Sequence, residues 1–148
     1  MSLIIRKASV RWKGGAKGGA RAVTTESGVL KRAKFSLDTA LQNNSSNTDP
    51  GELLAAAHAG SFSMALSNEL GLKALAPGQV VTSATVTLEY ATGGWNLMNV
   101  HLSVVARLPK MTQGRFIDAT VRAKTNCLVS RSLRANISMY AKLEKPRQ

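Results

Sequence analysis

The feature that most constrains the fold is one apolar segment with a clear start signal and a clear stop signal. Asp49 is a good N-cap, Pro50 suits the first helical position, and Glu52 stands three residues after the cap, as in a capping box. Gly71 is a natural stop, so the pattern predicts a helix that ends at about Leu70 and is roughly 30 Å long. Because this segment is apolar almost all round, we expect it to be buried on all sides. In so small a chain, that burial requires surrounding sheets or a partner subunit.

A membrane span is the competing interpretation of this segment. His58 and three serines interrupt it, Glu52 and Glu69 lie close to its ends, and sheet-forming sequence flanks it. These features argue against a membrane protein. The chain has 148 residues and no internal repeat, so we expect a single domain over residues 1–148.

Strand and helix patterns lie on both sides of the long helix. Alternation and β-branched residues predict strands over 2–12, 20–25, 30–37, 79–90, 95–108 and 135–143. The glycines between residues 14 and 19 predict a flexible turn of a hairpin, and Gly93 and Gly94 predict a second turn. Segregated strands and helices predict an α+β fold with antiparallel sheets.

A second helix is predicted after the last of the central strands. Thr112 can cap it, it ends near Asn126, and a short helical turn starts at Cys127. The residues expected on its buried face are Phe116, Ile117, Thr120 and Val121.

The charge is unusually basic, with 20 Lys and Arg against 8 Asp and Glu, or +12 at pH 7. Both ends of the chain are basic and the middle is slightly acidic. Such a charge favours acidic partners, and nucleic acid is the obvious one. Net charge alone, however, does not indicate a protein that recognises bases in a groove of nucleic acid, and the chain has no RNA-recognition or zinc-finger pattern. We therefore expect a solvated basic surface, with nucleic-acid binding as the alternative.

Few residues in this chain can carry chemistry. Cys127 is the only cysteine, so it cannot form a disulfide within the chain, and a reducing cytoplasm fits that composition. It is either an inert buried thiol or a thiol activated by a helix start and by nearby cations. His58 and Ser61 are three residues apart and share a helix face. They could form a serine nucleophile and its base, but no nucleophile elbow is present, so we favour two polar groups in a tight contact. We expect no metal site and no cofactor.

Three blocks of the sequence resemble the OsmC family. Residues 48–67, which include Ala-Ala-Ala-His-Ala-Gly-Ser-Phe-Ser-Met-Ala-Leu, resemble the central helix of that family. Residues 12–28 are similar to its N-terminal hairpin, and residues 123–130 are similar to its second cysteine motif. The resemblance implies an OsmC-like α+β fold in which two chains intertwine and antiparallel sheets wrap around long central helices. It also implies the reduction of organic hydroperoxides in oxidative-stress defence, by a nucleophilic cysteine and a resolving cysteine.

The chain departs from the family pattern where that chemistry takes place. Ser61 stands at the nucleophile position, Gly51 at the position of a catalytic Glu, and Ala40 at the position of an Arg, whereas Cys127 matches the resolving position. A serine hydroxyl cannot follow the sulfur oxidation ladder, so the thiol peroxidase site is expected to be lost or altered. Glu52, nine residues before Ser61, is expected to act mainly in helix capping.

The sequence leaves four functional hypotheses. The first is a homodimer that keeps a pocket around His58, Ser61 and Cys127 for a small apolar or anionic ligand. The second is a one-cysteine hydroperoxide reductase that uses Cys127. The third, from the charge, is a basic nucleic-acid-binding protein, and the fourth and least favoured is a serine–histidine hydrolase. The expected location is the cytoplasm, away from the membrane.

Overall fold

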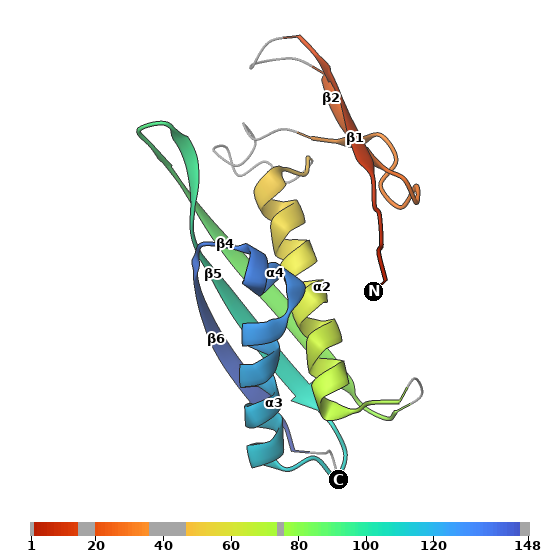
Figure 1. Cartoon of the computed structure of the whole chain (residues 1–148), viewed down its shortest axis with the longest axis vertical. Coiled ribbons are helices and arrows are strands. Elements are labelled where there is room, and N and C mark those ends of the chain that lie inside the picture. Colours follow the sequence, from red (N-terminus) through yellow and green to blue (C-terminus); the bar gives the residue numbers. More distant parts are fainter. Residues whose placement is uncertain (1, 15–19, 36–46, 74–75, 146–148) are drawn as a thin grey trace. The chain divides into compact units, whose positions relative to one another are not determined.

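A computed structural model describes residues 2–14, 20–35, 47–73 and 76–145 of the chain. The elements follow the order β1, β2, β3, α2, β4, β5, α3, α4 and β6 (Figure 1). They form two compact units, Met1–Leu53 and Leu54–Gln148. The predicted α+β class is confirmed, and the expectation of one domain over residues 1–148 remains a prediction.

The first unit contains an antiparallel sheet in the order β1 (Ala8–Lys13), β2 (Ala20–Thr25) and β3 (Ala33–Lys34). The hairpin was predicted, but its first strand is shorter than the expected range 2–12. Because Ala8 pairs with Thr25, the last residue of β2, the segment before Ala8 has no strand residue left to pair with. Of the predicted strand over 30–37, residues 30–35 are described, and among these only Ala33 and Lys34 form a strand. The hairpin glycines at 15, 18 and 19 lie outside the described residues.

Helix α2 (Pro50–Leu70) has the ends that the sequence predicts. The Asp49 carboxylate accepts a hydrogen bond from the Glu52 backbone N–H at 2.8 Å, which is the expected N-cap. Gly71 follows with a φ of 64°, in the left-handed region that glycine adopts at helix ends. Both boundaries are therefore set by local chemistry.

The second unit contains a three-stranded sheet with β5 (Gly94–Arg107) between β4 (Gln79–Ala91) and β6 (Asn136–Leu143). β4 and β5 form a long antiparallel hairpin, as predicted. β5 and β6 pair in parallel, so the expectation of antiparallel pairing is wrong for this pair. The reason is the connection: helices α3 (Gln113–Asn126) and α4 (Leu128–Ser132) return the chain to the end at which β5 began.

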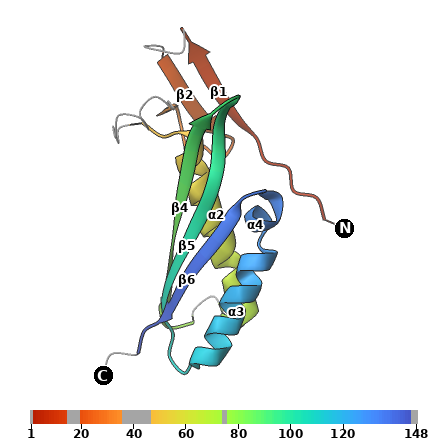
Figure 2. The ribbon, with the colours of Figure 1, turned by 90° about the vertical axis from the view of Figure 1, so that its left-hand side faces the viewer.

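Two helices cover one face of this sheet (Figure 2), and the core of the unit lies between these layers. Alternate residues of the central strand β5 are fully buried there, namely Val100, Leu102, Val104 and Ala106. From α3 the core receives Phe116, Ala119 and Ala123. The predicted buried face of α3 included Val121, but that side chain is 52% exposed. The buried residues of α3 still follow helical spacing, but the face that they form is rotated from the predicted face.

Within one chain, helix α2 is buried on one side only, so its expected burial on all sides would need a partner subunit and stays a prediction. The side chains of His58, Phe62, Leu66 and Leu70 lie four residues apart and are buried, whereas Met64, on another side of the helix, is 72% exposed. The sheet covers only one side of the helix. Among the described residues, no helix is long and apolar enough to cross a membrane.

Candidate functional site

Cys127 occupies the break between α3 and α4. It is the C-cap of α3 and the N-cap of α4, with extended backbone angles of −67° and 152°. Its N–H donates to the Ala123 carbonyl at 3.0 Å, and its own carbonyl accepts from the Arg131 N–H at 3.1 Å. The thiol is free and only 3% exposed. The sulfur is therefore held at a fixed, sheltered position.

A chain of hydrogen bonds joins this thiol to an imidazole on α2. The Cys127 thiol donates to Ser130 Oγ at 3.1 Å, and Ser130 Oγ lies 2.8 Å from His58 Nε2. With the hydroxyl oxygen accepting from the thiol, the hydroxyl proton is free to bond to Nε2. Sequence reasoning selected His58 and Cys127, and the structure brings them together through Ser130. Ser130 itself was missed, although its spacing of three residues from Cys127 is a usable signal.

The His58 side chain is completely buried, and its Nδ1 has no hydrogen-bond partner. Burial removes water from the imidazolium form and lowers the pKa of His58 below its usual 6.5. At neutral pH the ring is therefore neutral. A neutral imidazole whose Nε2 faces a hydroxyl group can accept a proton at that nitrogen.

Ser61 takes part in a separate contact. Its Oγ accepts a hydrogen bond from the Val129 N–H at 3.3 Å, in the first turn of α4. Both Ser61 and His58 are described, and no hydrogen bond joins them, because the imidazole Nε2 is directed to Ser130. The serine–histidine pair that a hydrolase needs is therefore not formed.

Ser61 also lines an open hollow of about 520 Å³ on the second unit. Most of its lining is small and apolar, and its polar members are Ser61 and Asn68. No charged side chain lines it. A Cβ placed on Gly60 would meet nothing within 4 Å, so the hollow is open at that point. The full lining consists of Ala56, Ala57, Gly60, Ser61, Met64, Ala65, Asn68, Leu128 and Val129.

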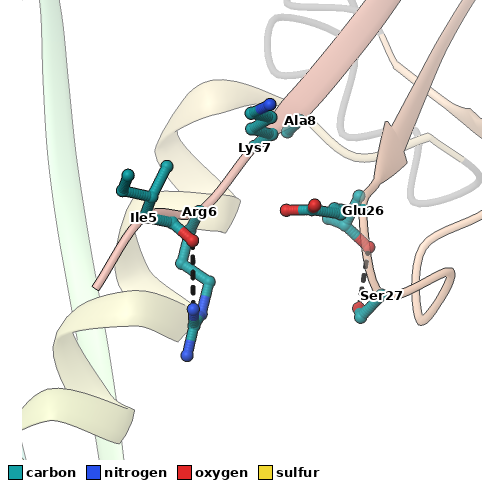
Figure 3. A pocket seen from close by; sticks show the side chains of 7 residues that line it. Ile5, Arg6, Lys7, Ala8, Glu26 and Ser27 are labelled. Carbon is teal, nitrogen blue, oxygen red and sulfur yellow. Dashed lines mark hydrogen bonds between the residues drawn. The ribbon is translucent and has the colours of Figure 1, made fainter. Parts of the chain in front are cut away.

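A second hollow, of about 800 Å³, lies on the first unit between the N-terminal segment and the end of β2. Figure 3 shows the Glu26 carboxylate extending toward the segment that carries Arg6 and Lys7. The Arg6 guanidinium donates to the Ile5 carbonyl at 3.0 Å. Charges of both signs and wide exposure make this a solvated surface rather than a shaped site.

The remaining positions from the sequence comparison are spread along the chain. Gly51 is buried in the first turn of α2. Ala40 lies outside the described residues. In the part of the chain that is described, no three His, Cys, Asp or Glu side chains form a group that could hold a metal ion.

Known proteins share this arrangement of sheets and helices. Residues 42–142 match a family model described as OsmC-like protein. The peroxiredoxin OsmC of Escherichia coli strain K12 is 34% identical over 141 residues, which cover 95% of this chain and 98% of that protein.

Solved structures agree with that match. An OsmC-like protein of unknown function from Vibrio cholerae superposes with a TM-score of 0.75 at 15% identity, covering 94% of this chain and 99% of the other. The organic hydroperoxide resistance protein OhrB of Bacillus subtilis superposes with a TM-score of 0.61 at 22% identity, covering 93% and 98%. The fold is thus that of the OsmC-like α+β proteins. The chain belongs to the OsmC family, as the sequence motifs indicate.

Proposed function

We propose that this chain is a member of the oxidative-stress branch of the OsmC family that binds a small apolar molecule and lacks the two-cysteine peroxidase reaction. The observation that carries the proposal is the apolar hollow of about 520 Å³ beside Ser61. Its volume falls within the range of small-molecule sites, and two polar side chains among apolar ones suit orientation of a ligand.

The residues at the reaction positions support the loss of the two-cysteine reaction. Ser61 stands where the resemblance puts a cysteine nucleophile, and Cys127 is the only sulfur that remains of the pair. A hydroxyl neither accepts the peroxide oxygen in a reversible step nor forms a disulfide. The relatives named for peroxiredoxin and organic hydroperoxide resistance activity suggest the class of molecule that once reacted here.

The lining of the hollow narrows the ligand class. An anionic ligand would need a cation, and no Lys or Arg lines this hollow. An apolar ligand with one hydrogen-bonding group fits better, because Ser61 and Asn68 offer a hydroxyl and an amide. We therefore favour an alkyl or aryl molecule over an acidic one.

A second copy of the chain is the expected cover of this hollow. Met64 is 72% exposed and Leu128 is 75% exposed at its edge, and such apolar exposure is typical of an interface. A homodimer would turn the open hollow into an enclosed pocket. This assembly follows from the resemblance and from the exposed apolar side of α2.

One pair of measurements on purified protein tests the proposal. The first is turnover of an organic hydroperoxide with a dithiol reductant, and we expect none above the uncatalysed rate. The second is binding of an apolar fluorescent naphthalene dye, which we expect to weaken at least about tenfold in Gly60→Leu, because leucine fills the open point of the hollow.

Gly114→Leu serves as the control for dye binding, since Gly114 also lies in a helix and a Cβ added there would also meet nothing within 4 Å, but it does not line the hollow. Equal dye binding in the wild type and Gly60→Leu would reject the hollow as the binding site. Hydroperoxide turnover in the wild type would reject the loss of peroxide chemistry.

A one-cysteine hydroperoxide reductase is the second candidate, and the bonds from Cys127 through Ser130 to His58 favour it. The thiol proton would pass to Ser130 as the Ser130 proton passes to His58 Nε2. The thiolate would then attack the outer peroxide oxygen, breaking the O–O bond, and the leaving alkoxide would take the proton to become an alcohol. The sulfenic acid formed on Cys127 would be reduced by two molecules of a low-molecular-weight thiol, releasing water and a disulfide.

One experiment distinguishes the binding function from the one-cysteine reductase. Hydroperoxide turnover that is present in the wild type and absent from Cys127→Ala supports the one-cysteine reaction. Ser130→Ala should then reduce the rate about 10- to 100-fold without removing the sulfur, because it interrupts the proton path. The near-complete burial of Cys127 argues for the binding function as the first choice.

A further inference from the structure

The sheet of the first unit has two chemically different faces. In an antiparallel sheet, residues that pair directly across strands lie on the same face. Val10 pairs with Val23, and Trp12 pairs with Arg21, whose guanidinium lies 4.0 Å from the centre of the indole ring. That face is apolar and aromatic.

The opposite face carries cations and small or hydroxyl side chains. Arg11 pairs with Ala22, and Ala22 pairs with Lys34, so the two cations flank a small residue in one row across three strands. The other described members of this face are Ser9, Lys13 and Thr24. The described members include no carboxylate and no aromatic ring. We call Arg11, Lys13 and Lys34 the hairpin cations.

The hairpin cations form one patch and have no acidic partner among the described residues. The Cα atoms of Arg11 and Lys13 are about 6.8 Å apart along β1, and those of Arg11 and Lys34 are about 9.6 Å apart across two strand spacings. All three are exposed. The salt bridges among the described residues join Arg107 to Glu144 and Arg122 to Glu69, so they involve none of the hairpin cations.

We propose that this face binds the phosphodiester backbone of a nucleic acid, DNA or RNA. Three cations, two hydroxyls and no carboxylate match a row of phosphates in charge and in hydrogen bonding. The absence of an aromatic ring from the described members of the face removes base stacking, so binding is independent of sequence. This inference does not depend on the hollow beside Ser61, which lies on the other unit.

The chemistry of the face argues against other occupants. In a symmetric contact, a second copy of this chain would bring its own three hairpin cations against these, and like charges oppose that contact. Binding to a lipid surface would be strengthened by apolar side chains that insert into it, but the largest apolar side chain paired on this face is Ala22. A polyanion that binds through charge and hydrogen bonds, without apolar contacts, is the best match to this face.

The test is fluorescence anisotropy of the full-length chain with labelled single-stranded DNA, duplex DNA and RNA, each at several salt concentrations. For duplex DNA, replacing the three hairpin cations by glutamine should lower the slope of log affinity against log salt by about 2.7. Between about 50 and 200 mM salt, the wild type should therefore lose about 40-fold more affinity than the triple variant.

A matched control removes the same charge from the second unit, through Lys73→Gln, Arg134→Gln and Lys142→Gln. It should leave most of the salt slope intact. If the triple variant of the hairpin does not fold, as judged by circular dichroism, Lys34→Gln alone should lower the slope by about 0.9.

Three results would overturn the proposal. The first is an unchanged slope in the hairpin variants, and the second is an equal loss in the control variant. The third is tighter binding to an acidic polyglutamate peptide or to anionic phospholipid vesicles than to DNA and RNA. Equal affinity for oligonucleotides of different sequence supports it, and the arm with the highest affinity identifies DNA or RNA.

Discussion

At the scale of single residues, the hydroxyl of Ser130 links two groups that are far apart in the chain. It contacts the Cys127 thiol on one side and the His58 imidazole on the other. Because His58 is buried without a partner for Nδ1, this hydroxyl is the polar contact that the ring has. The protonation of His58 is therefore tied to the folded state.

The stability of the protein should fall in mild acid because of His58. Burial lowers the pKa of His58 in the folded state, whereas the unfolded chain binds a proton near pH 6.5. Below that pH the unfolded state holds more protons than the native state, so the free energy of unfolding should decrease as pH falls from 7 to 5. The slope from this one group is at most about 1.4 kcal/mol per pH unit.

Urea unfolding at several pH values measures this effect. In His58→Gln the acid-dependent loss should be smaller than in the wild type, although the variant is less stable at pH 7. His101→Gln is the matched control, because His101 is exposed and hydrogen-bonds Ser138 on the open face of the sheet. An acid dependence that is unchanged in His58→Gln would contradict the assignment.

His58, Ser61 and Cys127 could be selected from the sequence, but Ser130 and the hydrogen bonds among these residues could not. Helical spacing placed His58 and Ser61 near each other on α2, and the helix start at Cys127 is visible in the chain. Which atom of α4 faces which atom of α2 depends on the packing of two helices against one sheet. That packing turned His58 toward Ser130 and Ser61 toward Val129.

At the scale of the elements, the start of β4 depends on one glycine. Gly78 has a φ of 104°, and a Cβ there would run into the backbone carbonyl oxygen of Arg107, next to the pair between Gln79 and Arg107. The close approach of the two backbones requires a residue without a side chain.

Gly78→Ala should therefore lower the free energy of unfolding by at least about 2 kcal/mol, because the clash adds to an unfavourable backbone conformation. Gly28→Ala is the control: Gly28 has a φ of 78°, but a Cβ there meets nothing within 4 Å. It should cost about 1 kcal/mol. Thermal and urea unfolding of both variants test this, and equal losses would contradict the role of the Arg107 contact.

The boundaries of elements were predictable where local chemistry sets them. Asp49 and Gly71 determine the ends of α2, and Thr112 caps α3 by accepting from the Arg115 N–H at 3.2 Å. The direction of β6 was not predictable in the same way, because the choice of a strand partner is made between distant segments. The length of β1 likewise depends on where its partner β2 ends.

At the scale of the whole molecule, α2 leaves one side uncovered within one chain, and Met64 lies exposed on it. We predict that Met64→Lys weakens the proposed homodimer at least about tenfold, because it places a charge on that surface. Val81→Lys is the control, since Val81 is also an exposed apolar residue, at 54%, but lies on β4.

Sedimentation velocity over a range of protein concentrations measures the dimer. We expect the wild type and Val81→Lys to sediment as dimers and Met64→Lys to shift toward the monomer. A wild type that sediments as a monomer at every concentration would reject the dimer proposal. Loss of the dimer in both variants would reject its assignment to this side of α2.

The parallel pairing of β5 with β6 has a consequence for protein synthesis. A ribosome releases the chain from its N-terminus, so β5 emerges well before its neighbour β6, which spans Asn136–Leu143. Until then, one edge of β5 presents unpaired N–H and C=O groups. The newly made protein must pass through a stage in which an open strand edge invites pairing with other chains, and this stage ends only when translation has passed β6.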